Sequence, residues 1–168
     1  MELRCVMRLS ALFLLFFLIL AVQASAAPTQ FTGLVIAVAD GDTITVLTQD
    51  RQQIKIRLYG IDCPEKGQAF GNRAKQATAG AVHGKNVTVL PLDTDRYGRT
   101  VAVVLMPGGE SLNEHLVRDG FAWVYTKFCK REKICEPLRK LEKAASGQML
   151  GLWADKNPVP PWAWRKLK

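Results

Sequence analysis

The sequence predicts a β-rich α+β domain in which five short strands curl into a small barrel and three helices complete the fold. From residue 34 onward, apolar side chains alternate with polar ones at a period of two, with polar turns between the runs. Three other stretches repeat apolar residues at helical spacing. We assign this domain to residues 27–156 and treat residues 157–168 as a separate basic tail rich in Pro and Trp.

The first 26 residues predict a secretory signal peptide. Arg4 and Arg8 precede an apolar run over residues 9–22, and small residues follow at positions 24–26. The run is too short for a comfortable membrane span, so an uncleaved anchor is the less favoured alternative. Cleavage is expected after Ala26. We therefore expect a protein that is secreted or periplasmic and has no stable membrane association after cleavage.

The net charge restricts the class of partner without choosing one. The whole chain carries +8, and the predicted signal peptide accounts for only one of these charges. A basic exported domain favours polyanions, which are nucleic acid, anionic polysaccharide or a membrane surface. A monomer is the default expectation.

The sequence predicts three strands followed by a helix in residues 34–83. Strands are expected where apolar residues occupy alternate positions, at residues 34–38, 44–46 and 54–58. A meander of these strands places Asp42 at a strand end beside a turn. The following helix is expected over residues 69–83, where Gly84 fits the position that ends it.

After this helix the sequence predicts two more strands and two more helices. Strand patterns return at residues 86–90 and 100–105. Ser111 and Glu114 form a capping box for a helix that ends at Gly120, and a last helix is expected from near Pro137 to Met149. Five strands with this helix content are compatible with an OB-type barrel (the OB-fold), whose open face often binds oligonucleotides.

Three polar clusters interrupt the strand-like runs and carry the chemistry. They are Asp40–Thr43, Arg57–Glu65 and Asp95–Arg99. Their carboxylates suit a hard cation such as Ca²⁺ and a general base, and their arginines suit a phosphate. Each cluster alone is also compatible with an ordinary turn. Together they indicate cleavage of phosphodiester bonds.

Four motifs in this order resemble the staphylococcal nuclease (thermonuclease) family: Asp40–Thr43, Arg57–Glu65, Asp95–Arg99 and Asn113–Gly120. The resemblance extends from Phe31 to Trp153. It implies a five-stranded OB-fold barrel with three helices. It also implies calcium-dependent hydrolysis of single-stranded DNA and RNA to products with 3′-phosphates, by in-line attack at phosphorus.

The same resemblance implies a role for each site residue. Asp42, Asp62 and the backbone carbonyl of Cys63 would bind calcium. Glu65 would act as general base or orient the attacking water, and Arg57 would bind the phosphate and stabilise the transition state.

The remaining roles belong to the rim of the site. Arg99 would share the phosphate with Arg57, while Asp40 and Thr43 would contact the metal through water. Tyr97 would lie near the terminal phosphate. The two tyrosines of the family's base pocket align with Thr126 and Phe128, so Tyr125 is a candidate substitute beside Phe128.

The cysteines suggest one disulfide. Cys5 leaves with the signal peptide, and Cys129 and Cys135 lie close together in a basic stretch of an exported chain. We favour a bridge between them over two free thiols. Cys63 is then the odd thiol and is expected to be buried.

Three questions stay open at this stage. The tail carries Trp162, Trp164, Arg165 and Lys166, which either bind a single strand by stacking and charge or pack the tail onto the barrel. A non-catalytic nucleic-acid-binding OB module is the alternative to a nuclease. A domain for polysaccharide or membrane explains the charge but leaves the carboxylates unexplained.

Overall fold

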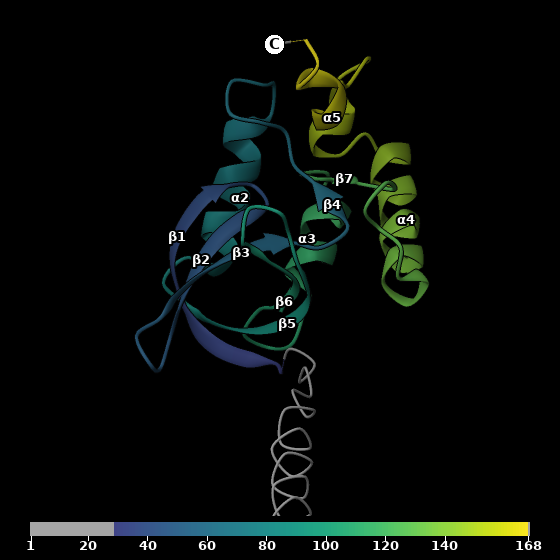
Figure 1. Cartoon of the computed structure of the whole chain (residues 1–168). Coiled ribbons are helices and arrows are strands. Elements are labelled where there is room, and N and C mark those ends of the chain that lie inside the picture. Colours follow the sequence, from purple (N-terminus) through teal and green to yellow (C-terminus); the bar gives the residue numbers. More distant parts are fainter. Residues whose placement is uncertain (1–28, 168) are drawn as a thin grey trace, which may run out of the picture.

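The computed structural model describes residues 29–167, so the predicted signal peptide lies outside the described residues. Five strands form the predicted closed barrel, in the order β1-β2-β3-β6-β5 (Figure 1). All neighbouring pairs are antiparallel except β3 and β6. The strands are β1 Phe31–Asp40, β2 Thr43–Thr48, β3 Gln53–Leu58, β5 Asn86–Thr94 and β6 Thr100–Leu105.

Strand β1 closes the barrel because it pairs with β5 at its start and with β2 along most of its length. Gly33 lies where both pairings overlap, and a Cβ there would be 2.5 Å from Val46 Cγ1 and 2.6 Å from the Leu47 carbonyl oxygen. Irregular register on either side of Ala37 bends the strand. The interior is filled by Val35, Ile44, Val46, Ile56, Val89 and Val104, which are fully buried. In β1 the expected alternation is on the wrong face: Leu34 is exposed and Ile36 and Val38 are half-buried, because positions 34, 35 and 36 are all apolar and the middle one points inward.

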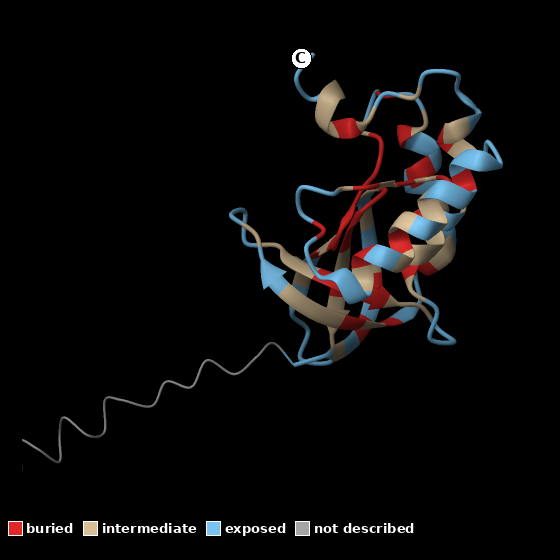
Figure 2. Ribbon diagram, turned by 90° about the vertical axis from the view of Figure 1, so that its right-hand side faces the viewer, coloured by how far each residue is buried: buried red, intermediate tan, exposed pale blue. Residues whose placement is uncertain are grey.

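Buried and exposed residues lie on different sides of three helices, which are α2 Gly71–Val82, α3 Leu112–Arg118 and α4 Glu132–Gly147 (Figure 2). Helices α2 and α3 pack against the barrel, and α4 packs on α3 and on β7 Trp123–Val124. The predicted cap of α3 is present, since Ser111 Oγ accepts a hydrogen bond from the Glu114 backbone N–H at 3.3 Å. Buried Asn113 joins α3 to the barrel by accepting from Val104 N–H at 3.1 Å and donating to the Tyr59 carbonyl at 2.9 Å.

The predicted start of the last helix near Pro137 is wrong. Helix α4 begins at Glu132 and its first turn closes when Cys135 N–H donates to the Arg131 carbonyl at 2.9 Å. Because proline is favoured in the first turn of a helix, the position of Pro137 predicted a start later than the observed one. Glu132 supplies the acidic residue that the positive end of the helix dipole prefers, and the lost hydrogen bond at Pro137 is tolerated inside the helix.

Four small elements were not predicted. β4 Ile61–Asp62 and β7 Trp123–Val124 form a two-stranded sheet beside the barrel. A 3₁₀ turn η1 spans Gly151–Ala154, and a short helix α5 spans Pro161–Trp164. In residues 29–167, no helix has the length and apolar character needed to cross a membrane.

Candidate active site

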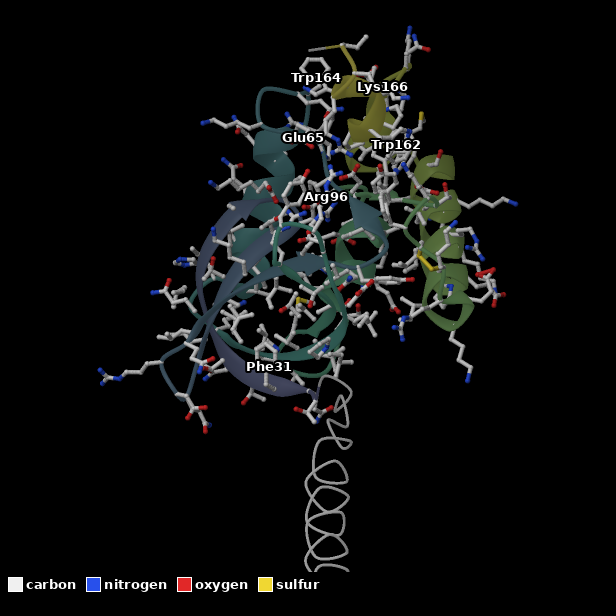
Figure 3. All side chains as sticks on the ribbon, viewed as in Figure 1. Phe31, Glu65, Arg96, Trp162, Trp164 and Lys166 are labelled. Atoms are coloured by element: carbon white, nitrogen blue, oxygen red, sulfur yellow. A yellow bond between two sulfur atoms is a disulfide. The ribbon has the colours of Figure 1, made fainter. Side chains whose placement is uncertain are left out.

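The three polar clusters meet at one end of the barrel. Figure 3 shows Glu65, Arg96 and Trp162 gathered near α5, whereas Phe31 lies at the opposite end. The β2–β3 pairing sets Thr43 opposite Arg57, which joins the first two clusters. The third cluster lies in the turn between β5 and β6, and Arg99 Nη1 donates to Thr43 Oγ1 at 3.4 Å.

Arg57 is the centre of the site because its guanidinium joins the two predicted metal ligands. Nη1 lies 2.9 Å from Asp42 Oδ2, and Nη2 lies 2.8 Å from Asp62 Oδ1. Burial alone would lower the pKa of Arg57, but the two carboxylates raise it overall. The guanidinium therefore stays charged in this buried position, as a phosphate-binding group requires.

Asp42 is fixed by its own turn and by the loop after β4. Its Oδ2 accepts the Cys63 backbone N–H at 2.7 Å, and its Oδ1 accepts Thr43 Oγ1 at 3.2 Å. Its own N–H donates to Asp40 Oδ1 at 3.1 Å. Burial raises the pKa of Asp42 to about 7, and Arg57 opposes this increase. The carboxylate is thus poorly solvated and gains from an added positive charge.

Gly41 allows this loop and turn to touch. A Cβ at Gly41 would lie 2.6 Å from Cys63 Cβ and 2.9 Å from Ala74 Cβ. Cys63 is a free, buried thiol, and burial raises its pKa well above the ordinary value. A thiol that remains protonated is a poor nucleophile, so Cys63 contributes packing and backbone groups.

Asp62 is almost completely buried, and guanidinium groups contact both of its oxygens. Arg57 contacts Oδ1, and Arg165 Nη2 lies 2.7 Å from Oδ2. Burial raises the pKa of Asp62, while hydrogen bonding from Arg165 and the charge of Arg57 oppose the shift. Sequence reasoning assigned Arg165 only to the tail. Its approach to Asp62 is a contact across 103 residues that no local pattern indicates.

Glu65 lies in the loop between β4 and α2 and is held there by backbone contacts. Its N–H donates to Gln68 Oε1 at 2.9 Å, and its carbonyl accepts Gln68 N–H at 2.9 Å. A Cβ at Gly71 would be 2.1 Å from the Glu65 carbonyl oxygen, so only glycine permits this close approach. The Glu65 carboxylate forms an ion pair with Arg165 Nη1.

Arg99 lies at the rim and is oriented by Asp95. The two side chains are 2.7 Å apart, and the Arg99 backbone N–H also donates to Asp95 at 3.0 Å. Burial would raise the pKa of Asp95, but these hydrogen bonds lower it overall, so the carboxylate stays ionised. The exposed ring of Tyr97 lies 5.6 Å from the Arg99 guanidinium carbon and 4.8 Å from that of Arg96.

The predicted base-pocket residues form an aromatic cluster with the tail. Tyr125 packs edge-on against exposed Phe128, with ring centroids 4.8 Å apart. Trp162 of α5 stacks on Tyr125 at 5.0 Å and 8°. The sequence left open whether the tail tryptophans bind a single strand or pack on the barrel. In the structure Trp162 packs on Tyr125, which follows β7 in the small sheet beside the barrel.

The residues present fit a hard cation. Asp42, Asp62 and the Cys63 carbonyl offer only oxygen, and Arg57 holds the two carboxylates close together. In residues 29–167, no group of three or more His, Cys, Asp or Glu side chains is arranged to hold a metal. Two carboxylates with backbone oxygen and water remain a suitable shell for calcium.

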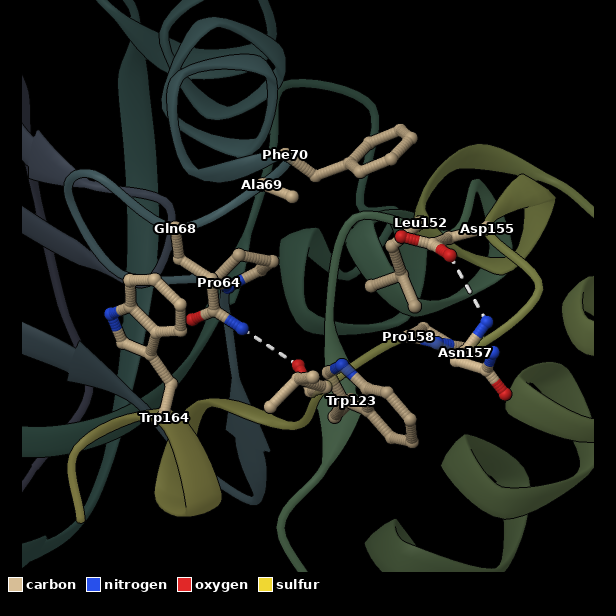
Figure 4. Close-up of a pocket in the computed structure, with 11 residues that line it drawn as sticks. Pro64, Gln68, Ala69, Phe70, Trp123, Leu152, Asp155, Asn157, Pro158 and Trp164 are labelled. Carbon is tan, nitrogen blue, oxygen red and sulfur yellow. Dashed lines mark hydrogen bonds between the residues drawn. The ribbon is translucent and has the colours of Figure 1, made fainter. Parts of the chain in front are cut away.

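The tail also borders a pocket next to this site. Figure 4 shows the pocket between the loop after β4, with Pro64, Gln68 and Phe70, and the tail, with Pro158 and Trp164. Gln68 Nε2 donates to the Val159 carbonyl at 2.6 Å across it. The loop that carries Glu65 is therefore joined to the tail by a direct hydrogen bond.

Comparison with known proteins agrees with this geometry. The chain is 45% identical over 153 residues to Protein ParB of Escherichia coli, covering 86% of this chain and 85% of the relative. It is 43% identical over 157 residues to a micrococcal nuclease of Shigella flexneri, covering 89% and 87%. An uncharacterized endonuclease of Escherichia coli O157:H7 is 43% identical over 136 residues, covering 81% and 86%. Residues 55–155 match the family described as Staphylococcal nuclease homologue, and the chain belongs to that family.

Proposed function

We propose that this nuclease is exported, depends on calcium and hydrolyses phosphodiester bonds of both DNA and RNA to leave 3′-phosphates. Its family and its nuclease relatives make it a hydrolase that acts on nucleic acid. The observation that carries the finer proposal is the bridge by Arg57 between buried Asp42 and Asp62, with Glu65 and Arg99 at its rim.

Asp42, Asp62 and the Cys63 carbonyl would hold calcium, which supplies a Lewis acid for a phosphoryl oxygen. Glu65 accepts the proton of the attacking water as its oxygen bonds to phosphorus. The P–O5′ bond breaks in line with this attack, and the departing O5′ takes a proton from solvent water, which gives a 3′-phosphate and a 5′-hydroxyl.

The two arginines stabilise the charge that develops on the phosphoryl oxygens. Arg57 lies inside the site, and Arg99 approaches from the turn between β5 and β6. Forked, charge-assisted hydrogen bonds from two directions hold the phosphate more firmly than a single ammonium group. Tyr97, Tyr125 and Phe128 place aromatic surface beside this position for the neighbouring nucleotide.

Cleavage by the purified chain from residue 27 tests the reaction. Single-stranded DNA and RNA are incubated with calcium and then with excess chelator, and product ends are identified by mass spectrometry. We expect calcium-dependent cleavage that is lost in Glu65→Gln and retained in Glu136→Gln, a change on the outer surface of α4. Binding without cleavage would support the non-catalytic module, and calcium-independent cleavage would contradict the metal assignment.

Export is tested by the N-terminus of the mature protein. The full chain is produced in a Gram-negative host, and the periplasmic and extracellular fractions are separated from membranes. We expect a soluble product whose first residue is Ala27 in one of these fractions. Recovery of the uncleaved chain in the membrane fraction would contradict the proposal.

A further inference from the structure

The tail lies on the groups that the proposed reaction needs. Arg165 follows α5 directly and forms ion pairs with both Asp62 and Glu65. One of these is a predicted metal ligand and the other is the predicted base. A guanidinium in this position supplies positive charge to the carboxylates but cannot act as a Lewis acid on a phosphoryl oxygen.

Several contacts hold the tail in this position. Trp162 stacks on Tyr125 and lies edge-on to Trp123 at 5.8 Å. Pro161 is buried, and the Val159 carbonyl accepts a hydrogen bond from Gln68. Figure 3 shows Trp162 and Trp164 at the end of the barrel where Glu65 lies. These contacts fix the position of α5, so that Arg165, the residue after the helix, reaches the Asp62 and Glu65 carboxylates.

The two arginines on Asp62 differ in how easily they can leave. Arg57 belongs to β3, is only 15% exposed and bridges two carboxylates. The Arg165 side chain is 41% exposed and follows a helix of four residues near the chain end. Water screens a half-exposed ion pair, so Arg165 is the partner that a stronger cation can displace.

We propose that Arg165 is a tethered cation that competes with calcium for Asp62 and occupies Glu65, so that the segment 157–167 closes the active site until calcium displaces it. This inference rests on the proposed function, because it assigns a regulator to the same site. The tether gives Arg165 a high effective concentration at Asp62. The apparent affinity for calcium is then reduced by the fraction of molecules in which the tail is released.

Calcium binding measures this competition without reference to activity. Calcium is titrated into the chain from residue 27 by calorimetry, and the wild type is compared with Arg165→Gln and Lys166→Gln. We expect Arg165→Gln to bind calcium roughly tenfold more tightly because the competitor is gone. Lys166→Gln removes the same charge from the neighbouring exposed position, and we expect its dissociation constant to stay within about twofold of the wild type.

The position of Trp162 gives a second readout. The protein is labelled with 5-fluorotryptophan, and the Trp162 resonance is assigned from Trp162→Phe. We expect calcium to move this resonance toward that of a solvent-exposed indole, and we expect Arg165→Gln to show part of the shift without calcium. The inference is overturned if calcium does not move the Trp162 resonance and if Arg165→Gln has the same calcium dissociation constant as the wild type.

The outcomes separate this inference from the proposed function. If the wild type cleaves DNA with calcium and Arg165→Gln binds calcium no more tightly, only the competition is wrong. If neither protein binds calcium and neither cleaves DNA, the proposed function fails and the competition fails with it.

Discussion

The backbone N–H of Cys63 donates a 2.7 Å hydrogen bond to Asp42 Oδ2. This bond joins the turn after β1 to the loop after β4 at the centre of the site. It forms only because Gly41 has no side chain to keep the two segments apart. The geometry of the two predicted metal ligands therefore depends on a glycine that carries no chemistry.

Gly41→Ala is expected to lower both stability and activity. Its Cβ would lie 2.6 Å from Cys63 Cβ and 2.9 Å from Ala74 Cβ, so the turn or the loop must move. Overpacking of this kind costs about 1–3 kcal/mol. Urea unfolding and cleavage of single-stranded DNA measure the two effects. Gly80→Ala in α2, where nothing lies within 4 Å of the new Cβ, is the control and is expected to be neutral or stabilising.

Arg99→Gln is expected to reduce kcat by about 10²–10³ while leaving the fold intact, since removal of one group that stabilises transition-state charge has this effect. The Arg99 side chain is partly exposed and its hydrogen-bond partners are the side chains of Asp95 and Thr43, so little packing is lost. The measurement compares kcat with the midpoint of thermal unfolding. Arg96→Gln changes an exposed arginine three residues earlier whose partner is Tyr97, and a loss of kcat as large as in Arg99→Gln would contradict the assignment.

The barrel was predictable from sequence because its information is local. The alternation of apolar residues in β2 and β3 and the helix cap at Ser111 are set by neighbours in the chain. In β1 three successive apolar residues at positions 34–36 predicted a strand but did not indicate which face is buried. The start of α4 was misjudged because a proline inside a helix is uncommon and its cost is offset by packing that the sequence does not reveal.

The site was predictable only in part. Its three clusters were visible as motifs, and the family resemblance supplied their roles. The ion pairs of Arg165 with Asp62 and Glu65 depend on how a distant tail packs, as does the stacking of Trp162 on Tyr125. No repeat or motif spacing in the chain indicates such contacts. The composition of the tail was therefore compatible both with binding a single strand and with packing on the barrel.

Glu142 is expected to make stability depend on pH. Its Oε1 accepts the Val124 backbone N–H at 2.7 Å. Burial raises its pKa above the ordinary 4.5, although this hydrogen bond opposes the shift. Between pH 4.5 and the raised pKa the folded state binds more protons than the unfolded state, so the free energy of unfolding falls as pH rises through that interval.

Glu142→Gln keeps an acceptor for Val124 and removes the buried charge. We expect this variant to be more stable than the wild type at pH 7 and to lose that advantage at pH 4, as measured by the urea midpoint. Glu142→Ala loses the hydrogen bond and is expected to be less stable at both values. Equal urea midpoints for the wild type and Glu142→Gln at pH 7 would show that the ionised Glu142 carboxylate does not destabilise the fold.

The Cys129–Cys135 disulfide is expected to stabilise the loop that carries Tyr125 and Phe128. The two residues are bonded at 2.02 Å with a sequence separation of 6. Tyr59 Oη holds the same loop by accepting Lys130 N–H at 2.8 Å. Loop-closure entropy for so short a loop corresponds to about 2 kcal/mol.

The double variant Cys129→Ala/Cys135→Ala is therefore expected to unfold about 2 kcal/mol more easily than the oxidised wild type. Reductant should bring the wild type to nearly the same midpoint and leave the variant unchanged. Because buried Cys63 is present in both proteins, it cannot account for the difference. If reductant left the urea midpoint of the wild type unchanged, the bridge would contribute nothing to stability. Tyr59 and the packing of α4 would then hold the loop that carries Tyr125 and Phe128.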